Sequence, residues 1–298
     1  MQAGTVKELA FFNQLHPLTV AIYFINLFAL LLMFNHLLVA LGLFGLVLLL
    51  CCWYFDRHKI KSLVIGSCSL MAMIIVFNVL LNQSGTRILW QFQWGAFHFQ
   101  LTETALIYGN AMALLLGGMI LTFVLFNGIV TTPKLSYLLF PVVPRLAMLL
   151  IISLRFVDLF IQKMQRLVML QKTRNVVVSE GSFRERLQKV GQLMRIILVD
   201  AVSGAMETAT LMEARGFGVT KRSHYQRFHY RLADTGFLLV SVVVFSLILL
   251  LRWQGCGWTN DVTQLRWLSQ SDWQLLGLIG LYCLLPLVGE GGYRLWEN

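Results

Sequence analysis

The chain has 298 residues, of which 57% are hydrophobic and only 13% are charged, and its formal net charge is +10. A soluble domain typically carries about 25% charged residues, so this composition excludes an ordinary soluble domain and indicates an integral membrane protein. The positive charge does not indicate a nucleic-acid-binding protein, because the sequence has no aromatic–basic motif of an RNA- or DNA-binding module.

Six apolar segments are long enough, or nearly so, to cross the hydrocarbon core of a bilayer as helices of about 20 residues. They lie near residues 17–34, 37–55, 62–82, 104–127, 234–252 and 271–288. We therefore predict an all-α integral membrane protein with about six transmembrane helices.

The charges of the loops predict how these helices are oriented. The loop 56–61 carries three Lys or Arg residues, and the segment 128–233 carries most of the remaining positive charge. Because Lys and Arg are enriched in cytoplasmic loops, we expect both segments and the N-terminus in the cytoplasm and the loop 83–103 outside. The aromatic residues of that outer loop, typical of a membrane–water interface, include Trp90, Phe92 and Trp94.

A basic, helix-patterned insert separates the fourth and fifth predicted spans. Residues 162–231 contain 13 Lys/Arg and 5 Asp/Glu. Apolar residues recur every three or four positions, which predicts two long helices, the first ending near Arg174 and the second running from Ser182 to Arg215. Ser182 followed by Glu185 is a capping-box signature for the start of the second helix.

The stretch 134–161 is apolar enough to suggest a seventh span. Arg145, Arg155 and Asp158 argue against it, because a charged side chain at mid-bilayer costs on the order of 3 kcal/mol. We expect instead a helix at the membrane surface and then a long helix leaving it.

These segments predict three parts of the chain. They are an N-terminal membrane domain with four spans (1–133), a cytoplasmic helical module (134–232) and a C-terminal membrane segment with two spans (233–298).

Both helices of the module are predicted to end in the same way. Gly216 follows Arg215, and glycine readily adopts the left-handed conformation that ends a helix. Asn175, which follows Arg174, is the second-best residue for that cap. An arginine at each helix tip is suited to pair with a carboxylate of a partner protein.

A stripe of small residues on the second helix predicts a close helix–helix crossing. Its members, spaced four apart, are Ala201, Ala205 and Ala209.

Several motifs together carry a family resemblance. They are His16-Pro17-Leu18-Thr19, Thr102-Glu103, the stretch 154–158, and a pair of Ala-Arg-Gly motifs that read Thr173-Arg174-Asn175 and Ala214-Arg215-Gly216. Over about residues 15–235 the chain resembles the transmembrane T component of energy-coupling factor (ECF) transporters, the family that includes the cobalt-transporter subunit CbiQ. The first Ala-Arg-Gly motif departs from the family pattern, whereas the second, after Met212-Glu213, matches it fully.

The resemblance implies a fold and a role. It implies two long cytoplasmic coupling helices crossed like an X, two ATP-binding-cassette (ABC) ATPase subunits docked on their tips, and a separate membrane-embedded S component that binds a vitamin or a transition metal. The chain would be a non-enzymatic coupling subunit of the cell membrane, without a cofactor or a metal of its own. The residues assigned to ATPase coupling are Thr173, Arg174, Asn175, Glu213, Ala214, Arg215 and Gly216.

Two other classes of function stay open. A self-contained permease would bind its solute in its own spans, whose main polar residues are Asn26, Asn78, Asn110 and Asn127. An intramembrane enzyme would need acids or Ser/His groups inside the spans. The acids of the predicted spans, Asp234 and Asp272, both lie at the extreme ends.

Overall fold

The computed structural model describes residue 12 and residues 15–82, 88–94, 97–141, 143–173, 182–216, 230–257 and 270–297. The chain divides into two compact units. One comprises Met1–Thr131 and Phe228–Asn298, and the other comprises Thr132–Arg227. We call them the membrane unit and the helical module and describe each by itself.

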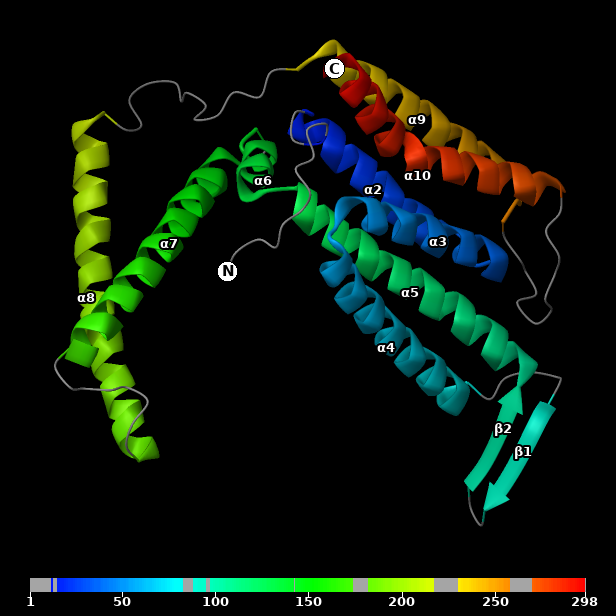
Figure 1. Cartoon of the computed structure of the whole chain (residues 1–298), viewed down its shortest axis with the longest axis horizontal. Helices are drawn as coiled ribbons and strands as arrows, with labels where there is room; N and C mark the ends of the chain where they lie inside the picture. The colour runs from blue at the N-terminus through cyan, green and yellow to red at the C-terminus, as the bar shows by residue number, and fades with distance from the viewer. Residues whose placement is uncertain are drawn as a thin grey trace. The chain divides into compact units, whose positions relative to one another are not determined.

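The described part of the membrane unit is built mainly of long apolar helices (Figure 1). They are α2 (Pro17–Met33), α3 (Leu37–Tyr54), α4 (Arg57–Leu81), α5 (Glu103–Ile129), α9 (Leu232–Trp253) and α10 (Gln270–Glu297). Five of them are long and apolar enough to cross a membrane, and α2 is an apolar helix of 17 residues, at the lower end of the usual range. The predicted all-α membrane architecture is confirmed.

A two-stranded hairpin interrupts the helical pattern where only a loop was expected. Strands β1 (Ile88–Trp94) and β2 (Phe97–Thr102) pair in antiparallel fashion between α4 and α5. Polar and apolar residues alternate along both strands, which is the period of a strand rather than a helix. Thr102 ends β2 and also starts α5, since its side chain accepts a 3.3 Å hydrogen bond from the amide of Ala105.

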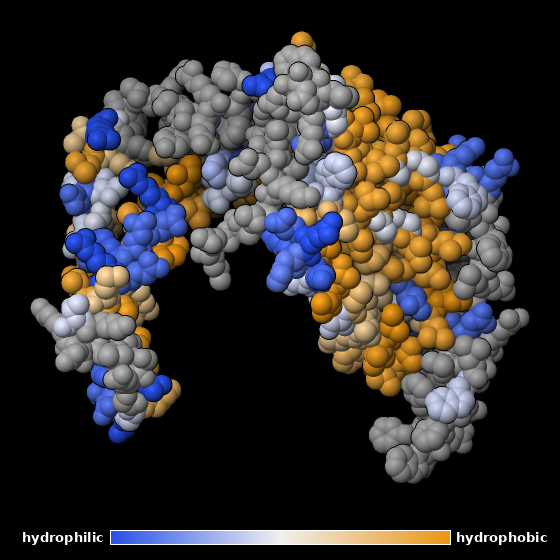
Figure 2. Space-filling view, in the orientation of Figure 1, coloured by the Kyte–Doolittle hydropathy of each residue, from blue (hydrophilic) through white to orange (hydrophobic). Residues whose placement is uncertain are grey.

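The core of the membrane unit is apolar and lies where α2 and α3 pack with α5, α9 and α10. Its fully buried residues include Leu27, Leu30, Leu43, Val47 and Ile279. Hydrophobic residues also cover most of the visible outer face of this unit (Figure 2). An apolar surface outside an apolar core is expected of a protein whose solvent is lipid.

Buried polar groups fix α10 against its neighbours. The rings of Tyr23 on α2 and Tyr282 on α10 stack with centroids 5.2 Å apart. The Tyr282 hydroxyl donates to the carbonyl of Tyr23 at 3.1 Å and accepts from the hydroxyl of Ser241 on α9 at 3.2 Å. These bonds join three helices at one point in the core and satisfy groups that lipid cannot solvate.

The helical module contains a short helix α6 (Thr132–Leu139) and two long helices, α7 (Pro144–Thr173) and α8 (Phe183–Ala214). Helix α7 is not among the helices apolar enough to cross a membrane. The charged residues that argued against a seventh span are therefore spread along one continuous amphipathic helix of 30 residues.

Candidate functional site

The start of α8 is fixed by the predicted capping box. The amide of Ser182 donates to the Glu185 carboxylate at 3.1 Å, and the amide of Glu185 donates to the Ser182 hydroxyl at 3.5 Å. Two amides that a helix start leaves unpaired are thereby satisfied, and the predicted start is confirmed.

The end of α8 is the best-defined part of the predicted coupling site. The helix ends at Ala214, the amide of Arg215 donates to the carbonyl of Leu211 at 3.2 Å, and Gly216 has φ +70°. Gly216 therefore adopts the predicted left-handed conformation, which ends the helix. The side chains of Glu213, Ala214 and Arg215 are exposed, so this tip presents a carboxylate and a guanidinium to its surroundings.

The other predicted tip is described only in part. Thr173 is the last residue of α7, is exposed, and donates its hydroxyl to the carbonyl of Leu170 at 2.7 Å. Arg174 and Asn175 lie outside the described residues. The coupling role of this motif stays a prediction.

Helices α7 and α8 cross in the module (Figure 1). Leu193 and Ile197 of α8 are its buried residues. An open, almost wholly apolar groove of about 430 Å³ runs along the contact and is lined by Phe160, Ile161, Met164, Gln165, Met194, Ile197 and Leu198. The contact is therefore held mainly by large apolar side chains from both helices.

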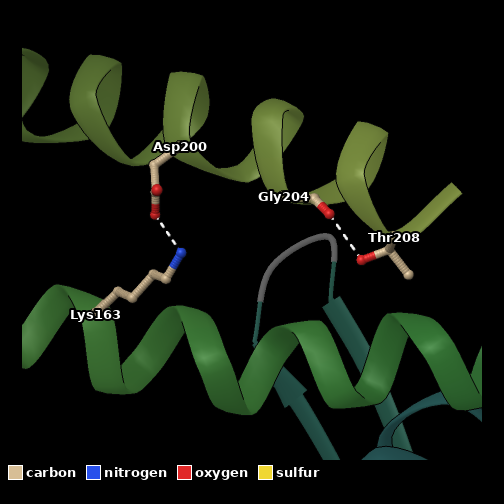
Figure 3. A network of polar contacts seen from close by, with 4 residues as sticks. All are labelled: Lys163, Asp200, Gly204 and Thr208. Atoms are coloured by element: carbon tan, nitrogen blue, oxygen red, sulfur yellow. Dashed lines mark hydrogen bonds and ion pairs between the residues drawn. The ribbon is translucent and has the colours of Figure 1, made fainter. Parts of the chain in front are cut away.

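An ion pair lies beside this contact. Lys163 of α7 donates to the carboxylate of Asp200 on α8, as Figure 3 shows. Both side chains are about half exposed, at 48% and 52%, so the pair contributes at most about 1 kcal/mol to stability.

The alanine stripe lies next to the contact rather than at its centre. Ala201 is half-buried, whereas Ala205 and Ala209 are exposed. One turn further along, the Thr208 hydroxyl bonds to the carbonyl of Gly204 in its own helix (Figure 3). The surface of α8 around Ala205 and Ala209 is thus open within the module, and its use as a crossing point stays a prediction.

Much of the apolar surface of α8 is exposed in the module. The exposed large side chains of this helix include Leu187, Leu198, Val199, Val202 and Met206. Exposed apolar side chains in such number on one helix are suited to contact with a protein or a membrane.

The motif His16-Pro17-Leu18-Thr19 has a clear structural role in the membrane unit. The Nδ1 atom of His16 accepts from the amide of Leu18 at 3.3 Å and caps α2, while the main-chain amide of His16 donates to Oδ1 of Asp234 at 2.7 Å. Oδ2 of Asp234 accepts from the amide of Arg231 at 2.8 Å. Asp234 is almost fully buried, so one carboxylate links the starts of α2 and α9.

Burial and a nearby charge shift the pKa of His16 in opposite directions. Burial lowers the pKa of the imidazole below its usual value, and the nearby carboxylate of Asp234 offsets part of this shift. A neutral imidazole is also what the cap requires, since only an unprotonated Nδ1 accepts the Leu18 amide.

One buried acid was missed by the sequence analysis. Glu290 lies in α10 and is 1% exposed, but the last span was expected to end at residue 288. The helix α10 instead continues to Glu297, so Glu290 lies inside it.

Comparison with known proteins decides the family. The sequence model of the CbiQ family, described as cobalt transport protein, matches residues 10–225. The chain belongs to this family. The matched range contains α2 to α8, including the exposed tip at Arg215, and ends before α9.

Individual relatives carry the name energy-coupling factor transporter transmembrane protein EcfT. The chain is 28% identical to the protein from Exiguobacterium sibiricum over 60% of this chain and 72% of that protein. It is 27% identical to the Staphylococcus aureus protein and 32% identical to the Listeria innocua protein. These two alignments cover 38% and 37% of this chain and 42% of each relative. The chain is thus a multi-pass membrane component of an ECF transporter, in a family of non-catalytic subunits.

Proposed function

We propose that this chain is the coupling subunit of an ECF-type importer. In this role it transmits ATP-driven motion from two ABC ATPase subunits to a separate S component that binds a vitamin or a transition metal. The observation that carries the proposal is the tip of α8, where a left-handed Gly216 follows an exposed Arg215.

The chemistry of this tip supports docking to a protein surface. A guanidinium forms two parallel hydrogen bonds to a carboxylate, so an exposed arginine at a rigid helix end positions a partner as well as attracting it. Among the described residues, none has a non-neighbouring atom within 4 Å of the position that a Cβ of Gly216 would take, which leaves room for a partner backbone to approach. In this proposal Arg174 has the same role at the tip of α7, with Thr173 and Asn175 beside it.

The exposed apolar surfaces of α7 and α8 support the binding of a second partner protein. They include the groove lined by Phe160, Met164 and Met194, together with the face around Ala205 and Ala209. An apolar surface next to a charged tip suits a subunit that binds an ATPase at one place and a membrane protein at another.

The polar residues of the spans favour this role over a self-contained permease. The amides of Asn110 and Asn127 donate to carbonyls of their own helix, those of Leu106 and Phe123, at 2.9 and 3.1 Å. In the part of the chain that the structure describes, no three His, Cys, Asp or Glu residues come together. A permease for a charged solute would instead gather His, Asp or Glu side chains around one point near mid-membrane.

The proposal includes an orientation. The N-terminus and the helical module lie in the cytoplasm, where ATP is available. The positive charge of residues 162–231 supports this orientation.

Charge reversal at the α8 tip tests the proposal. The tagged chain is purified from its own host with Arg215→Glu, with Arg174→Glu, or with Arg195→Glu as a matched reversal at an exposed position in the middle of α8. We expect wild type and Arg195→Glu to retain ABC ATPase subunits, and Arg215→Glu to lose them while staying inserted in the membrane.

The same preparation identifies the cargo partner. Mass spectrometry of a small membrane protein that co-purifies with wild type names the S component. A chain that purifies alone and binds a solute itself would contradict the proposal and favour the permease.

A further inference from the structure

The hairpin between α4 and α5 has two chemically different faces. Residues directly opposite each other in an antiparallel pair share a face, and successive residues alternate between faces. The apolar pairs are Trp90 with Leu101, Phe92 with Phe99, and Trp94 with Phe97. The polar pairs that alternate with them are Gln91 with Gln100 and Gln93 with His98.

The hairpin lies where two membrane-spanning helices end. α4 ends at Leu81, and β2 passes directly into α5 at Glu103. α5 crosses once and ends at Ile129, immediately before the helical module. The hairpin therefore lies at the end of α5 that is opposite to Ile129.

The hairpin does not continue the axis of α5. Figure 1 shows it turned away from that axis, on the same side of α5 as α4. Since α5 crosses the membrane, a hairpin turned off its end runs along the membrane surface rather than out into water. β2 also contacts both α4 and α5, which holds the hairpin near their ends.

The exposed surface of α4, whose end lies beside the hairpin, is suited to contact with lipid. α4 is the least buried of the five candidate spans, with 6% of its apolar window buried. An open groove along α4 is lined by Leu70, Met73, Ile74, Phe77, Asn78, Leu81, Asn82 and Tyr108. It reaches Asn82, the cap residue of α4, so the lipid-facing surface of the span extends to the end of the helix beside the hairpin.

We propose that the β1–β2 hairpin is an interfacial anchor, whose apolar face lies in the headgroup region of the leaflet at the start of α5. Tryptophan and phenylalanine are suited to that region, where a large ring is partly dehydrated. Trp90, on this face, is 61% exposed in the structure. Residues 88–102 carry no Lys, Arg, Asp or Glu, so the anchor does not depend on anionic lipid.

Adjacent residues on the two faces give a sharp test. Spin labels are attached to Phe92→Cys or Gln91→Cys in the full chain, with its five native cysteines replaced, in phosphatidylcholine nanodiscs. The ratio of collisions with oxygen, which dissolves in lipid, to collisions with a water-soluble nickel chelate is measured at each label. We expect this ratio to be about tenfold higher at Phe92 than at Gln91, because only the apolar face contacts lipid.

Two results would overturn the anchor. Equal access of the nickel chelate to both labels would mean that the hairpin stands in water. Shielding of the Phe92 label from both reagents would mean that protein covers the face.

A second measurement does not depend on the cysteine-free variant. Trp90 and Trp94 are two of the eight tryptophans of the chain. In vesicles of brominated phosphatidylcholine, where bromine quenches nearby tryptophans, the double variant Trp90→Phe/Trp94→Phe is expected to lose part of the quenchable fluorescence of wild type. An unchanged quenchable fraction would contradict the proposal.

Discussion

The main-chain amide of His16 donates a 2.7 Å hydrogen bond to the carboxylate of Asp234, 218 positions later in the chain. The same carboxylate accepts from the amide of Arg231, so it binds the first turns of two helices at once. A buried carboxylate at two helix starts is stabilised by the positive ends of both helix dipoles. Arg231 is the N-cap residue of α9, so Asp234 fixes the start of α9 against the start of α2.

Removing this carboxylate is expected to destabilise the membrane unit. Asp234→Ala leaves two amides without acceptors and should lower the free energy of unfolding by about 3 kcal/mol. Asp234→Asn keeps one acceptor and should cost less. Thermal unfolding of the purified protein in detergent measures both, with the exposed neighbour change Thr235→Ala as the control. Equal stability of Asp234→Ala and Thr235→Ala would refute this role.

Acid is expected to weaken the α2 cap through His16. Its folded-state pKa is lowered by burial, so the unfolded chain takes up the proton first as the pH falls. The stabilising contribution of neutral His16 is complete above its ordinary pKa near 6.5 and is lost as the pH falls from there toward the folded-state value. His16→Asn keeps a capping oxygen without titrating. Melting curves between pH 8 and pH 5 should therefore fall less steeply for His16→Asn, and identical slopes would exclude His16 as the source.

The left-handed residue at the α8 tip should be sensitive to a branched side chain. Gly216 has φ +70° and no close contact with the described residues, so the cost of Gly216→Val is conformational and amounts to about 1–2 kcal/mol. Gly216→Asn should be tolerated better, because asparagine visits this region. If Gly216 shapes an ATPase-docking tip, Gly216→Val should reduce ATP-driven uptake of the transported solute into reconstituted vesicles more than Gly216→Asn does. Gly204→Ala, within α8 and also in open space, is the control that should leave uptake unchanged.

The docking of α10 on α3 can be tested at one close approach. A Cβ added to Gly42 would lie 2.7 Å from Cδ2 of Leu276, whereas one added to Gly45 in the same helix meets nothing within 4 Å. Gly42→Val should therefore overpack this contact and destabilise the protein by about 1–3 kcal/mol. Gly45→Val introduces the same residue without the clash, and comparable melting temperatures for the two variants would argue against this packing.

Local sequence signals predicted the helices and their ends well. Each long apolar run became a helix, and Ser182, Glu185 and Gly216 made the caps expected of them. These features depend on a few consecutive residues, whose hydrogen bonds are satisfied locally. The hairpin was missed because its alternating pattern was interpreted only as a group of interfacial aromatic residues.

The sequence by itself determined that this chain is a polytopic membrane protein with a basic amphipathic insert, because lipid requires long apolar helices and charge asymmetry orients them. Only the tertiary structure decided that Asp234 joins α2 to α9, that Leu193 and Ile197 are the buried residues of α8, and that α10 packs on α3. Such contacts join residues that lie far apart in the chain. Many apolar helix faces have similar hydropathy, so side-chain volume and buried hydrogen bonds decide which faces pack together.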